Sequence, residues 1–343
     1  MTLPIPPPPR ALLVDTDPGL DDALALAVLT ASPDVRWLAA VAVGGNVPVA
    51  RTYRNLCGLL RLFGRADVPA LRGLDIPGGP DASHVHGRDG LAGYSGQLAK
   101  RRAASPARED WLAYVLRVLE RAPRHGVDII TLGPLTNLAA LIRAKPELLA
   151  DKVCHVIAMA GAIVEPGNIG PMVEFNVGCD PEAAGEVLRS GLPLLLVPLD
   201  VTHRVTLGRE VAARLARTGT AAGRALAHFL NASVDYQDSA FPAGPQGFGG
   251  PVSVGFAFVH DAVAVCAALR PGLFTWERLP LAIETQGVAR GMVLSDRRPG
   301  RPKVPGDWSI VSAAMHLDRQ AVRQWILEKL CEAAGSKGTS EDT

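Results

Sequence analysis

Four aspartates crowd into eight positions near the start of the sequence, within the segment VDTDPGLDDALAL over residues 14–26. The apolar run before them is typical of a β-strand, Pro18 and Gly19 predict a tight turn, and the apolar residues that follow recur at helical spacing. The four carboxylates are therefore expected at the carboxyl end of a strand, where open α/β sheets bind their ligands. They belong to Asp15, Asp17, Asp21 and Asp22.

This crowding of like charge predicts a bound cation. Carboxylates packed so closely repel one another strongly unless a cation neutralises them or protons are shared. Because every available ligand is oxygen, the segment favours a hard metal such as Ca²⁺ or Mg²⁺ over zinc. The alternative is an acidic, solvated helix N-terminus favoured by the helix dipole, which explains one or two acidic residues rather than four.

Five further segments add polar residues in a fixed order along the chain. They are VGGNV (43–47), HGRDGLAG (86–93), TLGPLTN (131–137), EPGNIGPMVEFN (165–176) and VHDAVAV (259–265). Together with the aspartate segment they resemble the motifs of nucleoside hydrolases of the inosine-uridine preferring type, over roughly residues 11–270. Members of that family are Ca²⁺-dependent N-ribohydrolases that split a ribonucleoside into ribose and a free base. The resemblance implies the same hydrolysis of an N-glycosidic bond here.

The resemblance also implies a Ca²⁺ site made of carboxylates and one backbone carbonyl. The implied ligands are Asp17, Asp22, Asp261 and the carbonyl of Leu132. The family often has threonine at the carbonyl position, and Thr131 lies one place before Leu132, so a shift of one residue stays open. Asp17 is in addition the candidate general base for a Ca²⁺-bound water, because a carboxylate beside a dication stays ionised.

A second group of residues is implied to hold the ribose through its hydroxyls. It comprises Asp21, Asn46, Asn168, Glu174 and Asn176. Carboxylates and amides at fixed positions favour the sugar and reject deoxy analogues, which would leave buried groups unpaired. Asn46 on its own is also ordinary turn chemistry after a strand. Asp15 is expected behind the metal ligands, with capping of the strand end as its alternative role.

Histidines and aromatic residues are the candidates for contacts to the base. His260 precedes Asp261, and the resemblance implies that it assists the departing base as an acid; the alternative is a structural histidine. His86 lies on a glycine-rich stretch expected to act as a mobile flap that binds substrate. His203 is expected to be structural. The aromatic residues that could stack on the base, or simply pack, are Tyr236, Phe241, Phe248, Phe256 and Phe258.

The recurring apolar runs predict an α/β fold with a mostly parallel, doubly wound sheet and helices on both faces. Strands are expected at 11–15, 37–43, 127–132, 153–159 and 193–199. Helices are expected at 20–31, 48–63, 109–121, 135–144, 181–190, 208–232, 261–269 and 317–333. A single domain is predicted over 11–333, after a flexible Pro-rich lead-in over 1–10 and before a disordered tail over 334–343. Two long loops, 73–108 and 235–255, are expected to be lids or binding loops.

Composition narrows the class of protein. The 343 residues are 48% hydrophobic and 20% charged, enough for a large core, and the net charge of +1 lacks the basic excess that nucleic acids attract. The chain has no signal-peptide pattern and no apolar run of the roughly 20 residues that span a bilayer. Five cysteines without CxxC spacing indicate free thiols in a reducing cytosol. Composition therefore favours a cytoplasmic protein with no nucleic-acid or membrane partner. The resemblance implies an enzyme for a small ribonucleoside, and we expect a homo-oligomer, either a dimer or a tetramer.

Other functions compete with this interpretation. A haloacid-dehalogenase-type phosphohydrolase also begins with Asp-x-Asp after its first strand, but Asp21 and Asp22 have no function in that mechanism. A non-catalytic nucleoside-binding protein on the same scaffold would be expected to have lost part of the aspartate set, which is complete here. A nicotinamide dehydrogenase is disfavoured because no GxGxxG follows the first strand. The sequence does not distinguish between purine and pyrimidine bases.

Overall fold

The structure is a computed structural model that describes residues 10–99, 110–241, 254–298 and 306–335. Its strands are β1 Arg10–Thr16, β2 Val35–Ala42, β3 Ala70–Arg72, β4 Val127–Thr131, β5 Val153–Met159, β6 Leu194–Val197, β7 Thr206–Gly208, β8 Phe256–Phe258, β9 Phe274–Ile283, β10 Val293–Ser295 and β11 Ser309–Leu317. Its α-helices are α1 Leu20–Thr30, α2 Val49–Leu62, α3 Ser83–His86, α4 Ser95–Ala99, α5 Trp111–Glu120, α6 Thr136–Ala144, α7 Pro146–Lys152, α8 Phe175–Cys179, α9 Pro181–Arg189, α10 Leu199–Thr202, α11 Arg209–Ala216, α12 Ala221–Ala240, α13 His260–Leu269 and α14 Arg319–Ala333. Two 3₁₀ turns are η1 Pro271–Leu273 and η2 Gly287–Ala289.

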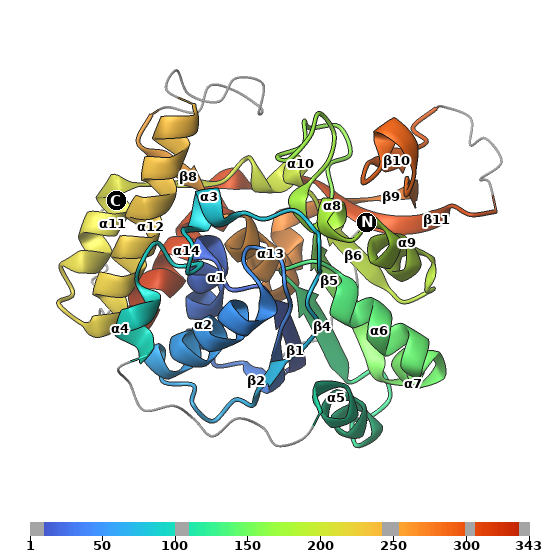
Figure 1. The fold of residues 1–343 in the computed structure, drawn as a ribbon, viewed down its shortest axis with the longest axis horizontal. Coiled ribbons are helices and arrows are strands. Elements are labelled where there is room, and N and C mark those ends of the chain that lie inside the picture. Colours follow the sequence, from blue (N-terminus) through green and yellow to red (C-terminus); the bar gives the residue numbers. More distant parts are fainter. Residues whose placement is uncertain (1–9, 100–109, 242–253, 299–305, 336–343) are drawn as a thin grey trace.

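A nine-stranded sheet within the described residues forms the centre of the molecule (Figure 1). Its strand order is β10-β9-β11-β6-β5-β4-β1-β2-β3. Every pair from β3 across to β6 is parallel, and β11 continues the sheet parallel to β6. Only β9 and β10 are paired antiparallel, at one edge. This confirms the predicted α/β fold with a mostly parallel sheet.

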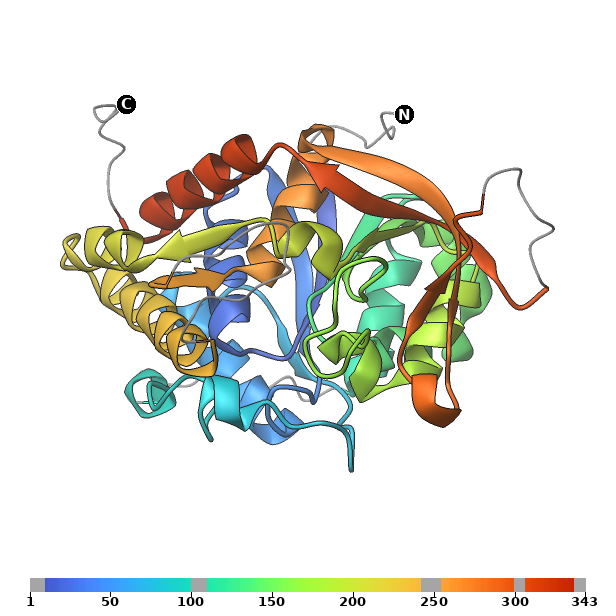
Figure 2. The ribbon, with the colours of Figure 1, turned by 90° about the horizontal axis from the view of Figure 1, so that it is seen from above.

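Alternation along the strands sends side chains to two separate hydrophobic clusters, one on each face of the sheet. On β1, Leu12 and Val14 join one cluster and Leu13 joins the other. The first cluster lies under α1, α2, α11, α12, α13 and α14, and the second under α5, α6, α7 and α9. Figure 2 shows these two helical layers, with the yellow α11 and α12 on one side of the sheet and the green helices on the other. Helices therefore cover both faces, as the sequence predicts.

Several predicted elements differ from the observed ones. The single helix expected over 208–232 is two helices, α11 and α12, because Gly219 at a φ of +67° breaks the chain between them and Thr220 caps the second. The two expected long loops are shorter, since α3 and α4 form within the first and α12 continues into the second as far as Ala240. Strands β3, β7, β8, β9, β10 and β11 were not predicted.

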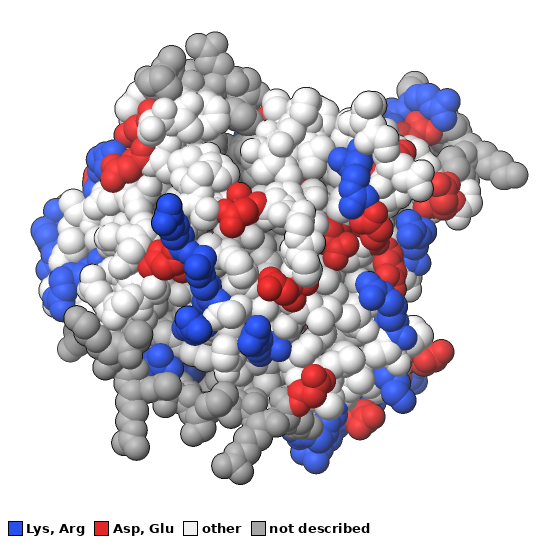
Figure 3. Space-filling model, in the orientation of Figure 1, with Lys and Arg blue, Asp and Glu red and all other residues white. Residues whose placement is uncertain are grey.

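The predicted ends of the chain fall mostly outside the described residues. In the lead-in predicted over 1–10, only Arg10 is described, and it begins β1. In the tail predicted over 334–343, only Ala334 and Gly335 are described, after the end of α14. Among the described helices, none is both long enough and apolar enough to cross a membrane. On the face drawn in Figure 3, basic and acidic side chains are interspersed.

Candidate active site

A cavity of about 300 Å³ opens at the carboxyl ends of the parallel strands. The turns after β1, β2, β4 and β5 all lead into it, which is where an open α/β sheet places a ligand crevice. The sequence-predicted site residues all lie in its wall. They are Asp17, Asp21, Asp22, Asn46, His86, Leu132, Asn168, Glu174, Asn176, His260 and Asp261.

Three carboxylates form the most concentrated charge in this cavity. Oxygens of Asp21, Asp22 and Asp261 lie within 4.8 Å of one another, and Asp22 and Asp261 are almost fully buried. Asp21 and Asp22 occupy the first turn of α1, and Asp261 lies in the first turn of α13, which packs against α1. Two helix N-termini thus bring their first turns together, and both helix dipoles favour negative charge there.

Asp17 lies beside this trio without being a member of it. Its Oδ2 accepts a hydrogen bond from the backbone N–H of Asn46 at 2.7 Å. Glycines enclose the carboxylate: a Cβ on Gly45 would lie 2.1 Å from Oδ2, and one on Gly133 would lie 2.6 Å from Oδ1. No larger residue fits at either position while Asp17 keeps this orientation. The VGGNV and TLGPLTN segments therefore shape the space for this carboxylate.

Burial and mutual repulsion make the carboxylates costly to ionise. Burial raises the pKa of Asp17 well above its usual value, and the charge of Asp22 adds to the rise. Burial and then the neighbouring Asp21 and Asp22 do the same to the pKa of Asp261. Burial also raises the pKa of Asp21 to about 6. A cation between these groups would remove both causes of repulsion.

The donor set fits a hard cation. All the side chains of the trio and of Asp17 offer oxygen, the ligand type that Ca²⁺ and Mg²⁺ prefer. The Leu132 carbonyl lies in the same cavity wall, where it also accepts a hydrogen bond from the Asn176 side chain at 2.7 Å. A carbonyl oxygen has two lone pairs, so this hydrogen bond leaves one for a further ligand.

Asparagine and glutamate side chains fix the turns around the carboxylates. Asn46 donates from Nδ2 to the Asp17 carbonyl at 3.0 Å and to Asp22 Oδ2 at 3.1 Å. The Glu174 carboxylate accepts the backbone N–H groups of Gly161, Asn176 and Val177. Such carboxylate and amide contacts hold the loop between β5 and α8 against the sheet. They leave part of the acceptor capacity of Glu174 for a ligand.

The remaining predicted residues frame the cavity. Asn168 is exposed, and its Oδ1 accepts the backbone N–H of Phe175 at 2.8 Å. His86 Nδ1 accepts the backbone N–H of Leu20 at 3.0 Å, so its ring proton is on Nε2 when the ring is neutral. Burial lowers the pKa of His86 to about 4. His86 therefore joins the expected flap segment to the start of α1.

His260 lies half-buried at the start of α13. Its Nδ1 is 2.8 Å from the hydroxyl of Thr202, and its ring lies next to those of His203 and Phe258. Burial, followed by the nearby His86, lowers the pKa of His260 to about 4, so the ring is neutral at pH 7 in the free protein. A neutral imidazole can still donate one N–H to a ligand atom.

The outer wall contains residues that the sequence did not single out, together with some that it did. Tyr236, Phe241 and Phe258 line the cavity as expected of base-stacking residues, Phe256 does not line it, and Phe248 lies outside the described residues. The wall also includes His84, Val85, Ile169, Phe175, His203, Ser233 and Gln237. His203, expected to be structural, borders the cavity. For these additional wall residues, the only signal in the sequence is that they lie close to predicted site residues or to aromatic residues.

Asp15 lies behind the cavity rather than in it. Its Oδ2 accepts a hydrogen bond from Asn137 Nδ2 at 2.8 Å, and its backbone carbonyl accepts the Leu132 N–H. Burial raises the pKa of Asp15 to about 8, against the lowering effect of the Asn137 hydrogen bond. The side chain thus tethers β1 to the turn after β4, on which Leu132 lies.

None of the five cysteines lines the cavity. The five cysteines, all of them among the described residues, form no disulfide. Cys154 belongs to a separate group with Asp128 and His155, whose potential ligand atoms lie within 4.8 Å of one another at the opposite ends of β4 and β5 from the cavity. The all-oxygen group is therefore distinct from this mixed one.

The fold and the cavity together define a carboxylate-lined ligand site at the carboxyl edge of a mostly parallel α/β sheet. The family model described as "Inosine-uridine preferring nucleoside hydrolase" matches residues 12–324. The chain belongs to this family, and it is an enzyme that hydrolyses N-glycosyl bonds of ribonucleosides.

Named relatives share most of the chain. A protein named non-specific ribonucleoside hydrolase RihC from Salmonella schwarzengrund is 34% identical over 322 residues, covering 92% of this chain and 96% of its own. A probable uridine nucleosidase 2 from Arabidopsis thaliana is 29% identical, covering 94% and 98%. The solved structure of a plant nucleoside hydrolase, PpNRh1, has a TM-score of 0.82 at 28% identity, covering 94% of this chain and 99% of its own.

Proposed function

We propose that this chain hydrolyses ribonucleosides to ribose and free base with a bound Ca²⁺, and that Asp17 activates the attacking water. One observation supports the metal above all: Asp21, Asp22 and Asp261 hold oxygens within 4.8 Å of one another in a buried cavity. Such a group is stable as three carboxylates only beside a cation. We propose Asp17, Asp22, Asp261 and the Leu132 carbonyl as the ligands, with Asp21 near enough to share the site.

Asp17 is proposed as the general base because of its restricted position. When bound, the cation would supply Lewis-acid and templating chemistry to the water and the ribose diol. The Asn46 N–H and the two glycines hold the Asp17 carboxylate in one orientation. A base held in this way can accept a proton from a water in the cavity without side-chain reorganisation.

The sugar subsite is proposed to comprise Asp21, Asn46, Asn168, Glu174 and Asn176. Glu174 and the two buried asparagines are already held by backbone hydrogen bonds. Because these acceptors and donors are already ordered, they can bind ribose hydroxyls without a further loss of side-chain conformational entropy. The base is proposed to lie toward His86, His260 and the aromatic wall, where His260 would donate a proton to the departing base.

A non-catalytic nucleoside-binding protein on the same scaffold is the alternative that the family assignment counts against. The aspartate set is complete, and this favours catalysis. The family assignment sets aside the haloacid-dehalogenase-type phosphohydrolase. We further propose a homo-oligomer, dimer or tetramer, in the cytoplasm; the free thiols support the reducing compartment, and sedimentation of the purified chain tests the oligomeric state.

The decisive assay is release of reducing sugar from inosine, adenosine, guanosine, uridine and cytidine, with and without a chelator. We expect ribose release from at least one nucleoside, its loss on chelation, and its recovery on adding Ca²⁺. Chelation should also lower the melting temperature, because a ligand that binds only the folded state stabilises it by mass action. Full activity in metal-stripped protein would contradict the metal proposal, and binding without ribose release would favour the non-catalytic one.

A further inference from the structure

The short helix α10 lies between the two halves of the candidate site. It follows β6 directly, and the Leu199 N–H donates to the carbonyl of Gly161 at 2.9 Å. Gly161 begins the loop that ends in α8 and that holds Asn168 and Glu174. At its other end α10 leads into His203, which borders the cavity. One turn of helix therefore contacts both the sugar side and the proposed base side.

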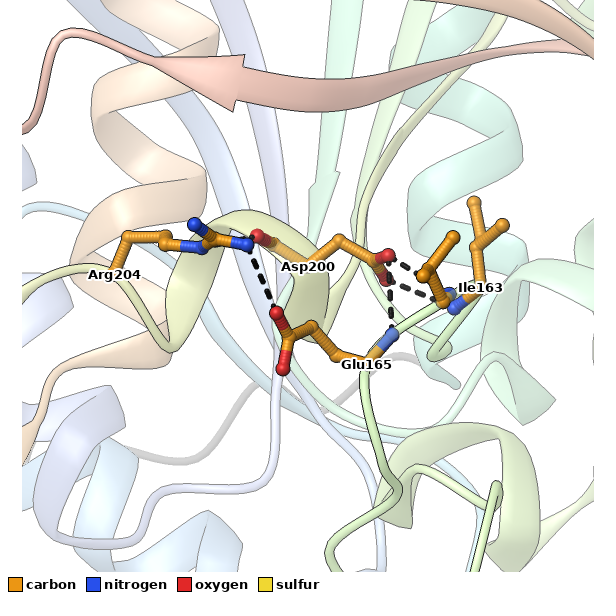
Figure 4. A network of polar contacts seen from close by, with 5 residues as sticks. Ile163, Glu165, Asp200 and Arg204 are labelled. Carbon is orange, nitrogen blue, oxygen red and sulfur yellow. Dashed lines mark hydrogen bonds and ion pairs between the residues drawn. The ribbon is translucent and has the colours of Figure 1, made fainter. Parts of the chain in front are cut away.

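Asp200 is the main tie between α10 and the sugar-side loop. Its carboxylate, 3% exposed, accepts the backbone N–H groups of Ile163 at 2.8 Å, Val164 at 2.8 Å and Glu165 at 3.3 Å (Figure 4). Three consecutive amides that point at one carboxylate fix the local backbone of the loop. Charge-assisted hydrogen bonds of this kind are stronger than neutral ones.

Arg204 closes the same connection from outside. Its Nη2 donates to Glu165 Oε1 at 2.9 Å, and its Nε donates to the Asp200 carbonyl at 3.2 Å (Figure 4). The guanidinium thus bridges α10 and the loop. Three residues after Glu165 the chain reaches Asn168 in the cavity wall. Movement of this anchor would displace Asn168 directly.

Thr202 connects α10 to His260. The Thr202 side chain is fully buried, and its hydroxyl lies 2.8 Å from Nδ1 of His260. When the hydroxyl donates to Nδ1, the single proton of the neutral imidazole resides on Nε2. This contact holds the rotation of the ring, and a hydroxyl that donates to Nδ1 leaves Nε2 as the nitrogen that can donate.

We propose that α10 positions both halves of the site, with Asp200 holding the sugar-binding loop and Thr202 setting the orientation and tautomer of His260. Both are positioning residues, since neither is proposed to touch the reacting atoms. The inference rests on the proposed function of the cavity. It goes further in assigning two separable effects to two residues on the same turn of helix.

Thr202 is tested by an isosteric pair of variants. Thr202→Val removes the hydroxyl and keeps the shape, and Thr202→Ser keeps the hydroxyl. We expect Thr202→Val to lower kcat on the best ribonucleoside about 10-fold, with little change on p-nitrophenyl riboside, whose leaving group departs unaided, and Thr202→Ser to stay near the parent. In a His260→Ala background Thr202→Val should have no additional effect. Equal losses on both substrates, or an undiminished loss without His260, would overturn the assignment.

A second readout of Thr202 does not depend on turnover. Nitrogen-15 NMR of the histidine rings distinguishes the two neutral tautomers, and His260→Ala identifies the resonance among the eight histidines. We expect a single Nε2–H tautomer for His260 in the parent and in Thr202→Ser, and a mixture in Thr202→Val. An unchanged tautomer in Thr202→Val would contradict the proposal even if the protein released no ribose at all.

Asp200 is tested by its effect on ribose binding. Asp200→Asn replaces one acceptor oxygen with a donor, so the loop amides lose a partner. We expect KM to rise about 10-fold on the ribonucleoside and on p-nitrophenyl riboside alike, because both contain ribose. For Arg204→Met we expect a smaller rise in KM with kcat unchanged. Arg204→Met covers the case in which Asp200→Asn fails to fold.

The matched control is Asp318→Ala, which removes the side chain that caps α14 through the Ala321 N–H and that does not line the cavity. It should lower the melting temperature without changing KM. If Asp200→Asn and Arg204→Met behave like this control, α10 merely stabilises the fold and the positioning role is refuted. Absence of ribose release in the parent would instead count against the proposed function, and the NMR readout would still decide on Thr202.

Discussion

Asp17 illustrates how strongly a single side chain depends on residues distant in sequence. Its carboxylate is held by the Asn46 N–H and fits only because positions 45 and 133 are glycine. Those glycines lie on the turns after β2 and β4, the strands that flank β1. The geometry of this residue is therefore a property of three adjacent strand ends.

Asp17→Asn removes one negative charge and the proposed base while it keeps the size of the side chain. We expect turnover to fall at least about 100-fold, the lower end for general base catalysis, with the fold retained. Initial rates on the best ribonucleoside, with circular dichroism as the control for folding, check this. A variant within threefold of the parent would show that another residue activates the water.

His260→Ala tests whether the departing base needs a proton. A purine or pyrimidine anion leaves poorly, whereas p-nitrophenolate leaves readily without help. We expect nucleoside hydrolysis to fall by roughly 10²-fold to 10⁴-fold, and p-nitrophenyl riboside hydrolysis to stay nearly intact. Comparable losses on both substrates would mean that the substitution disturbs Asp261, and His260 would then be a structural neighbour.

The inner half of the site could be predicted from the sequence, and the outer half only in part. Residues such as Asp17, Asn46 and Leu132 directly follow buried strands, and a parallel sheet brings such positions together at one edge. Ser233 and Gln237, which the sequence did not single out, lie instead in the last part of the 20-residue helix α12. Their place in the cavity wall depends on how α12 packs against α1 and β8, and no local pattern encodes that packing.

At the scale of elements, the strands buried on both faces were the predictable ones. β1 contains the continuous apolar run ALLV and β6 is LLLV, as parallel strands covered on both sides should be. Strand β9, which lies between the edge strand β10 and β11, instead has the partly exposed pattern of FTWERLPLAI, interrupted by Pro280, and was not predicted. Its pairing with β11 joins segments separated by residues 284–308, which include β10, so no short hairpin pattern links the two strands in the sequence.

Thr220 tests the boundary that divides the predicted helix over 208–232. Its hydroxyl caps α12 by accepting the Gly223 N–H at 2.9 Å, and it donates to the carbonyl of Ala334 at 2.7 Å. We expect Thr220→Ala to lower the free energy of unfolding by about 1–2 kcal/mol through the lost cap. Turnover should be unchanged because Tyr236 lies at the opposite end of α12. Urea denaturation measures the loss, and Thr220→Ser, which keeps the hydroxyl, is the control.

For the whole molecule, the buried carboxylates link stability to pH and to the cation. Burial raises the pKa of Asp15 to about 8 and the pKa values of Asp17 and Asp261 well above the ordinary value of 3.8. A carboxyl group with a raised pKa stabilises the folded state fully below its unfolded pKa, and this contribution is lost as the pH rises through the folded pKa. The buried histidines act in the opposite sense, but only below their ordinary value of 6.5. Above pH 6.5 the carboxyl groups alone therefore determine whether stability rises or falls with pH.

Metal-free protein should accordingly lose stability between pH 6.5 and pH 8, the window set by the histidine and Asp15 values. The loss is about 1.4 kcal/mol per pH unit for each carboxyl group that stays protonated in the folded state. Melting temperatures of metal-stripped and Ca²⁺-saturated protein across this window measure it.

With Ca²⁺ bound, the carboxylates in the cavity are ionised at every pH in the window, so the fall should shrink to the share of Asp15, which lies behind the cavity. Asp15→Asn removes that share and should leave the Ca²⁺-saturated protein nearly independent of pH. A constant offset between the stripped and loaded curves would show that the carboxylates and the cation are not coupled, and the cation would then bind elsewhere.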